Sequence, residues 1–251
     1  MMILTLAARE LRSLFLSPLA WVILAVISAL CAYFFLLYID VYLQIQPRLA
    51  GSVEGPGITD IIVTPLYSTA ATVLLLITPL LTMRLISEER RSQTLSLLIS
   101  APVSMTEIIL GKFLGVFGFL LILLALIAAM PLSLLAGGSL DPGLWASGLL
   151  GLVLLLASFC SIGLYISTLT TQPTVAAIGT FGVLLLLWIL NLASSTGLGG
   201  GGVLAYLSLL SHYQPLLSGV FSSTDIIYYL LLTGSCLALS VRRLDADRLQ
   251  H

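Results

Sequence analysis

Charged residues are scarce in this sequence of 251 residues, since Asp, Glu, Lys and Arg together make up 8% of it. The ten Lys and Arg residues are spread along the chain and cannot form the basic stripe that nucleic acid binding requires. Hydrophobic residues make up 59% of the chain, and the mean hydropathy is +1.14. These values exclude an ordinary soluble domain and predict an integral membrane protein, surrounded by a lipid bilayer and without a nucleic acid partner.

Residues that bind metals or act as nucleophiles are also few. The three cysteines, Cys31, Cys160 and Cys236, all lie in apolar segments, which is typical of small buried side chains rather than of a disulfide or metal site. Only two histidines occur, His212 and His251, and we interpret His212 as a polar residue at the membrane interface. We therefore predict no catalytic residue, no bound metal and no cofactor in this chain.

The sequence lacks the glycine-rich loop that binds nucleotide phosphates. Gly111-Lys112 is followed by Phe113, and the earlier glycine of that motif is missing. The chain cannot hydrolyse ATP alone, so any powered process needs ATP and Mg²⁺ bound by another polypeptide.

What the sequence has in abundance is long apolar runs. Six of them are long enough to span a bilayer as helices, at residues 19–39, 66–83, 113–135, 144–169, 175–192 and 226–241. Nine Lys and Arg residues then fall on one side of the membrane, and only Arg48 falls on the other. Because cytoplasmic loops carry the excess of Lys and Arg, this predicts an all-α, polytopic membrane protein with both termini in the cytoplasm.

Residues 3–16 have a different pattern from the spans. Ile3, Leu6, Ala7, Leu11, Leu14 and Phe15 lie near one helical face, with Arg9, Glu10, Arg12 and Ser13 elsewhere. This division predicts an interfacial helix along the cytoplasmic surface. Near the start of the third span, Gly111, Gly115 and Gly118 leave a groove in which another helix can pack closely.

The loop at 84–112 is the long polar excursion on the cytoplasmic side. Ser87 is expected to cap a helix with Glu88 and Glu89 in its first turn, and the helix continues through an apolar surface until Pro102 ends it. Ser104 and Glu107 form a capping box that begins a second helix. Such a loop is a docking site for a soluble partner.

The segment at 194–225 is the unusual one on the external side. It is apolar and aromatic, and Pro215 and Gly219 are expected to break it into short re-entrant helices that dip into the outer leaflet. We expect this segment to close the outer end of a pathway or to contact an external companion. The residues expected to do so are Leu209, Leu210, His212, Leu216 and Leu217.

Several of these residues also carry a family resemblance. The loop pattern, Glu88-Glu89-Arg90-Arg91, Thr94, Leu95, Leu98, Ala101-Pro102 and Gly111-Lys112, resembles the loop between the second and third spans of type-2 ABC exporter permeases. That family often has Gly before the Thr, where this chain has Gln93. The stretches ARELRSLFLSPLAW and YQPLLSGVFSSTDIIYYL are similar to the gliding-motility subfamily, in which Gly219, Asp225 and Tyr228 match by position.

The resemblance implies that residues 1–251 form a single transmembrane permease domain with the type V ABC exporter fold, in a bacterial cytoplasmic (inner) membrane. It implies a coupling helix docked on an ABC ATPase dimer, which would bind the ATP and Mg²⁺, and a second permease protomer. A companion membrane protein with a large external domain is also implied. The residues expected to couple to the ATPase are Glu88, Glu89, Arg90, Arg91, Thr94, Leu95, Leu98 and Pro102.

Three alternatives remain. The first is an ABC-type complex that transmits force or signal across the membrane without a cargo. The second is an intramembrane protease built on Glu88-Glu89, but Gln93 stands where those enzymes have Arg, and the needed histidines are absent from the later spans. The third is a channel or an ion-coupled carrier, which the absence of ionisable residues within the predicted spans disfavours.

Overall fold

The computed structural model describes residues 2–49, 57–93, 104–136, 140–195 and 206–249, and the part of the chain so described is helical, without strands. In chain order the helices are α1 (Met2–Leu16), α2 (Pro18–Leu49), α3 (Ile58–Thr82), α4 (Ser87–Arg91), α6 (Met105–Leu132), the 3-10 helix η1 (Ser133–Ala136), α7 (Pro142–Leu169), α8 (Pro173–Ser195), α10 (Leu209–Leu217) and α11 (Ser223–Leu249). The predicted all-α fold class is confirmed.

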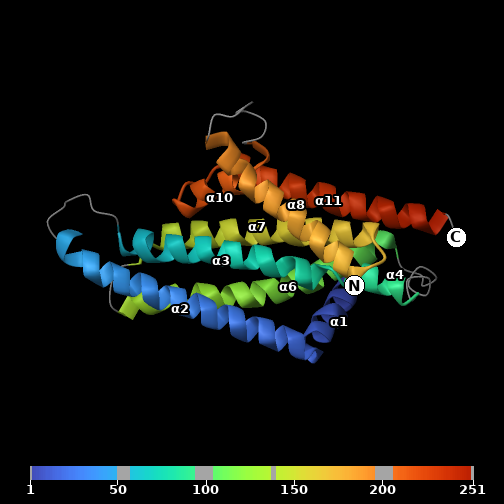
Figure 1. Ribbon diagram of the computed structural model, residues 1–251, viewed down its shortest axis with the longest axis horizontal. Helices are drawn as coiled ribbons and strands as arrows, with labels where there is room; N and C mark the ends of the chain where they lie inside the picture. Colours follow the sequence, from blue (N-terminus) through green and yellow to red (C-terminus); the bar gives the residue numbers. More distant parts are fainter. Residues whose placement is uncertain (1, 50–56, 94–103, 137–139, 196–205, 250–251) are drawn as a thin grey trace.

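Six of these helices, α2, α3, α6, α7, α8 and α11, are long and apolar enough to cross a membrane, as the hydropathy predicted. Figure 1 shows that α1, α4 and both chain termini lie at one end of the bundle, here called the terminal end, whereas α10 lies toward the opposite end, here called the α10 end. Helices continue beyond several apolar runs: α11 extends from the predicted 226–241 to Leu249, because polar residues past the apolar stretch can continue the helix in water.

The centre of the bundle is α7. It contacts α3, α6, α8, α10 and α11, and its Leu152, Leu155 and Phe159 are completely buried. By contrast, α2, α8 and α11 lie at the periphery with exposed leucine, isoleucine and valine side chains, such as Leu186 and Leu231. A chain that spans a bilayer can leave such faces to lipid or to another membrane helix.

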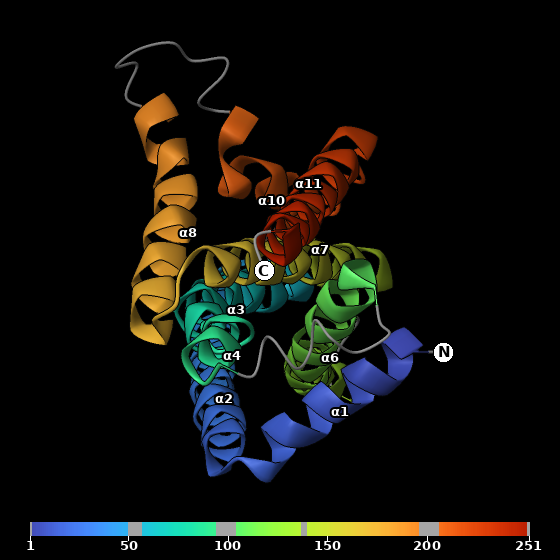
Figure 2. The same ribbon diagram turned by 90° about the vertical axis from the view of Figure 1, so that its right-hand side faces the viewer.

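Helix α1 lies across α6 at the terminal end, as Figure 2 shows. The two helices are so close that a Cβ atom on Gly111 would be 2.6 Å from the Cβ of Leu6, and one on Gly115 would be 2.6 Å from the Cβ of Glu10. The predicted glycine groove is therefore filled by the chain's own N-terminal helix. Glu10 was expected away from the apolar face, which is wrong: it follows Leu6 by four residues and faces α6 with it.

Two predicted helix ends are also wrong. In the polar loop, α4 ends at Arg91 instead of continuing to Pro102, because Gln93 has a left-handed backbone with a φ of 57°. In the segment at 194–225, Pro215 lies inside α10 instead of breaking it, since the helix ends two residues later and only one backbone hydrogen bond is lost. The break falls at Gly219, whose φ of 81° favours glycine.

Candidate functional site

The start of α4 is anchored to the central helix α7. The backbone amides of Ile86 and Ser87 both donate hydrogen bonds to the side-chain oxygen of Ser167, each at 3.1 Å. Ser87 was predicted as the cap, which is wrong: the N-cap residue is Ile86, and the Ser87 hydroxyl donates back to the carbonyl of Met83. A residue 80 positions away thus satisfies the free amides of this helix, and no local pattern in the sequence indicated it.

Glu89 is held from the other side by the buried Lys112 of α6. The ammonium Nζ of Lys112, which is 7% exposed, lies 2.8 Å from Glu89 Oε1 and 3.6 Å from Glu10 Oε2. One cation therefore joins α1, α4 and α6. The sequence offered one signal for this contact, namely a glutamate placed among the apolar residues of the N-terminal helix.

Arg90 extends the network to the C-terminal helix. Its guanidinium donates to Asp247 Oδ2 on α11, and Asp247 also lies 3.9 Å from Arg243. The side chains of Arg90 and Asp247 are 14% and 15% exposed. Together with the Lys112 contacts, this pair connects the five-residue helix α4 to α1, α6 and α11, so a displacement of α4 would disturb three longer helices.

The remaining charged residues of α4 face outward. Glu88 and Arg91 are exposed, and they border a cavity of about 500 Å³ whose opposite wall is Pro173 and Thr174 at the start of α8. Of the residues predicted to couple to an ATPase, Glu88 and Arg91 therefore lie on the surface, whereas Glu89 and Arg90 lie in ion pairs within the chain. Thr94, Leu95, Leu98 and Pro102 lie outside the described residues.

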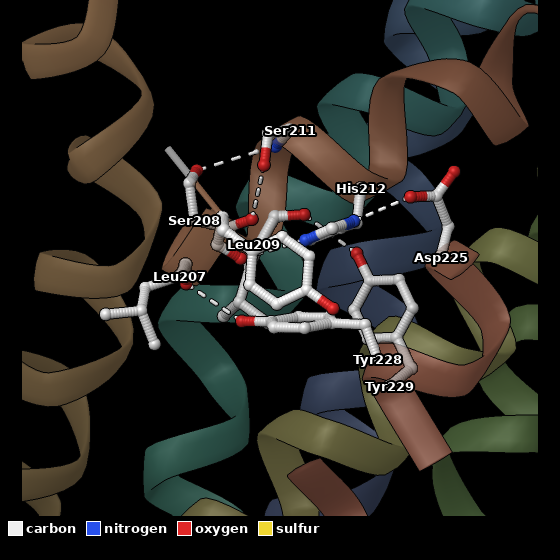
Figure 3. Close-up of polar contacts among 9 residues, drawn as sticks. Leu207, Ser208, Leu209, Ser211, His212, Asp225, Tyr228 and Tyr229 are labelled. Carbon is white, nitrogen blue, oxygen red and sulfur yellow. Dashed lines mark hydrogen bonds and ion pairs between the residues drawn. The ribbon is translucent and has the colours of Figure 1, made fainter. Parts of the chain in front are cut away.

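At the α10 end, a second polar cluster surrounds His212, and Figure 3 shows it pointing toward Asp225. His212 Nδ1 lies 2.6 Å from Asp225 Oδ1, its Nε2 lies 2.8 Å from the carbonyl oxygen of Tyr206, and both residues of the pair are buried. A carbonyl only accepts, so Nε2 carries a proton. His212 is therefore not an interfacial polar residue but a buried link between α10 and α11, and the thirteen-residue separation gave no sign of it.

Tyrosine hydroxyls connect α10 and the residues just before it to the neighbouring helices. Tyr228 donates to the carbonyl of Leu207 and Tyr229 to that of Leu209, each at 2.8 Å, as Figure 3 shows. Tyr213 donates to the carbonyl of Tyr67 on α3 at 3.1 Å. Burial raises the pKa of Tyr213 well above its usual value, so this hydroxyl keeps its proton and remains a donor.

The leucines predicted as an external contact surface are mostly interior. Leu209, Leu216 and Leu217 are buried and Leu210 is half-buried, packed within the core of the chain itself. Glycines on α7 make this possible: a Cβ on Gly151 would be 3.1 Å from Leu216. The apolar side chains that α10 and its flanks do expose are Tyr206, Leu207, Val220 and Phe221.

These positions bear on the alternative of a protease. Glu88 and Glu89 lie at the terminal end and His212 lies at the α10 end, so the structure does not bring the acids and this histidine together. Within the described ranges, no group of three or more His, Cys, Asp or Glu residues could hold a metal ion.

The geometry defines a multi-pass membrane protein with a short helix tied to the bundle at its terminal end. Residues 4–245 match the family model described as ABC-2 family transporter protein, and the chain belongs to this family. It is therefore a permease subunit of an ABC transporter, and the membrane components of this family are generally non-catalytic. A search of curated proteins gave no match.

Proposed function

We propose that this permease couples ATP hydrolysis on a separate ATPase dimer, which binds ATP and Mg²⁺, to export or to another conformational change across the membrane. The observation that carries the proposal is the position of α4. It exposes Glu88 and Arg91 on one side, and Glu89 and Arg90 connect it to α1, α6 and α11 on the other. A partner that moves α4 would act on three helices at once.

The orientation follows from the charges. Nine of the ten Lys and Arg residues lie in or beside α1, α4, the start of α6 and the end of α11, which supports a cytoplasmic location of the terminal end by the positive-inside rule. In this proposal the membrane is a bacterial inner membrane, both termini are cytoplasmic, and α1 lies along the inner surface. The α10 end faces the outside.

Two further partners belong to this proposal. The apolar faces of α2, α8 and α11 are exposed in the single chain, which supports a second permease protomer beside it. Tyr206, Leu207, Val220 and Phe221 are each exposed at the α10 end, which supports contact with an external companion. Such a companion fits the gliding-motility subfamily, to which we assign the chain within its family.

Charge reversal at the two exposed residues tests ATPase docking. The double variant Glu88→Arg/Arg91→Glu should lower the recovery of the ATPase with the purified permease about tenfold, which corresponds to about 1.4 kcal/mol of binding free energy. Because both side chains are exposed, the unfolding free energy of the permease should change by less than about 0.5 kcal/mol.

A matched control is Arg12→Glu, which reverses an exposed charge on α1 away from α4. ATPase recovery should remain at the wild-type level in this variant. Equal recovery from wild type, control and double variant would show that α4 is not the docking site.

Cysteine labelling tests the orientation separately. In a background with Cys31, Cys160 and Cys236 replaced, Gln46→Cys at the end of α2 should react in intact cells with a membrane-impermeant thiol reagent. Ser92→Cys beside α4 should react only after the cells are opened. The reverse pattern would place α4 outside the cell and exclude ATPase docking there.

A further inference from the structure

A polar cavity lies at the terminal end, between α1, α2, α3, α4 and α6, and it shares Glu88, Glu89 and Lys112 with the coupling network. Its volume is about 360 Å³, which is at the small end of the range of about 300–1,000 Å³ for ligand sites. Figure 2 shows how α1 crosses from α6 to α2 at this end. The walls thus come from five helices, α1, α2, α3, α4 and α6.

The cavity is lined by three basic and three acidic side chains, namely Arg9, Arg84, Lys112, Glu10, Glu88 and Glu89. Lys112 contacts the carboxylates of both Glu10 and Glu89, so this group of three keeps one excess negative charge. Arg84 lies 4.0 Å from Glu88, and among the described residues Arg9 makes no ion pair, so these three residues together keep one excess positive charge.

The lining also has apolar side chains. Leu81, Leu85 and Ala20 are buried, whereas Leu19 and Leu80 are 43% and 48% exposed. The cavity therefore combines charged groups with exposed leucines. A phospholipid combines the same two kinds of chemistry at the membrane surface, where the amphipathic α1 is expected to lie.

We propose that this cavity binds the headgroup of a zwitterionic phospholipid of the phosphatidylethanolamine type. Arg9 and Arg84 donate charge-assisted hydrogen bonds to the phosphate, and the ammonium group lies against the carboxylates of Glu10 and Glu89. Leu19 and Leu80 contact the first part of the acyl chains. Because the charges of the wall sum to zero but are separated, a headgroup with both signs matches it better than an anionic headgroup.

Native mass spectrometry of the full-length permease in detergent, titrated with dioleoyl phosphatidylethanolamine or dioleoyl phosphatidylglycerol, tests this site. In Arg9→Gln/Arg84→Gln the dissociation constant for phosphatidylethanolamine should rise at least about tenfold, since two charge-assisted hydrogen bonds to the phosphate are lost. The matched control Arg12→Gln/Arg242→Gln removes two exposed arginines at the same end that do not line the cavity. It should bind the lipid like the wild type.

A separate variant tests the preference of the cavity for a zwitterionic over an anionic headgroup. Glu10→Gln removes one carboxylate but keeps the 2.8 Å contact of Lys112 with Glu89, so it should weaken phosphatidylethanolamine and strengthen phosphatidylglycerol binding. O-phosphoethanolamine, which has the same headgroup without acyl chains, should not displace the lipid at equal concentration. Equal loss in both arginine pairs, wild-type preference for phosphatidylglycerol, or displacement by the soluble headgroup would each overturn the proposal. Lipid binding is measured on the permease alone, and recovery of the ATPase is measured in a separate experiment. A failure of the ATPase-docking proposal would therefore leave the lipid result unchanged.

Discussion

The two ends of the bundle hold their short helices by different kinds of contact. At the terminal end, α4 is tied by ion pairs whose side chains are 9–20% exposed. At the α10 end, α10 is tied by tyrosine hydroxyls on backbone carbonyls and by a His–Asp pair that is 8% and 10% exposed. Lys112 is as shielded as the His–Asp pair, but its two carboxylate partners are 20% exposed and the Arg90–Asp247 pair is 14% and 15% exposed. Partly hydrated charges can change partners at a lower desolvation cost than fully buried polar groups. We infer that the terminal end is the movable one and that α10 is a fixed part of the core.

The largest effect is expected from breaking the pair at the α10 end. His212→Leu leaves the buried carboxyl of Asp225 and the carbonyl of Tyr206 without their partner, and should lower the unfolding free energy by about 3 kcal/mol. Asp225→Asn keeps a hydrogen-bonding group beside Nδ1 and should cost less than about 1.5 kcal/mol. Denaturant unfolding in detergent micelles measures both. Equal stability of His212→Leu and the wild type would contradict the buried link.

A smaller effect is expected at Lys112. Lys112→Met leaves Glu10 and Glu89 facing each other, but both glutamates are partly hydrated, so the unfolding free energy should fall by about 2 kcal/mol. The triple variant Glu10→Gln/Glu89→Gln/Lys112→Met removes all three charges and should recover most of that loss. If the triple variant were less stable than Lys112→Met, repulsion between the carboxylates would not be the cause.

The contrast between the ends also explains what could be predicted from the sequence. Hydropathy alone indicated the six spans, and local hydrogen bonding indicated the Ser104–Glu107 capping box, which the structure confirms with contacts of 3.1 and 3.2 Å. Both features depend on residues close together in the chain. The hydrogen bonds from the start of α4 to Ser167 of α7, and the contact of His212 with Asp225, depend instead on which helices pack together. Neither Ser167 nor His212 differs locally from an ordinary polar side chain.

The leucines of α10 were predicted to contact an external partner, and the structure instead buries most of them for a related reason. The apolar composition indicated that leucines such as Leu209, Leu216 and Leu217 need burial, but composition does not say against what they are buried. The small residues on α7, Ser147, Gly148 and Gly151, leave the space that Leu216 and Leu217 occupy. A helix with larger residues at these positions would have left the leucines for a partner.

A weaker effect on stability, but a specific one on coupling, is expected at Asp247. Asp247→Asn removes the charge opposite Arg90 and should cost about 1 kcal/mol or less, since the pair is near the surface. If α11 moves with α4, stimulation of ATPase turnover by the permease should fall several-fold while ATPase recovery stays unchanged. Asp245→Asn, an exposed residue on the same helix, is the control. Unchanged turnover in Asp247→Asn would show that α11 does not follow α4.

A local effect on backbone conformation is expected at Gln93, where the helix at the movable end terminates. Its φ of 57° is costly for a residue with a side chain, and this is the position at which the resembled family often has glycine. Gln93→Gly should leave the unfolding free energy unchanged or raise it by up to about 1 kcal/mol, whereas the β-branched Gln93→Val should lower it by about 1–2 kcal/mol. Ser92→Val, at a neighbouring residue with a φ of −82°, should be close to neutral and serves as the control. If Gln93→Gly were less stable than Gln93→Val, the side chain of Gln93 rather than its backbone conformation would determine how α4 ends.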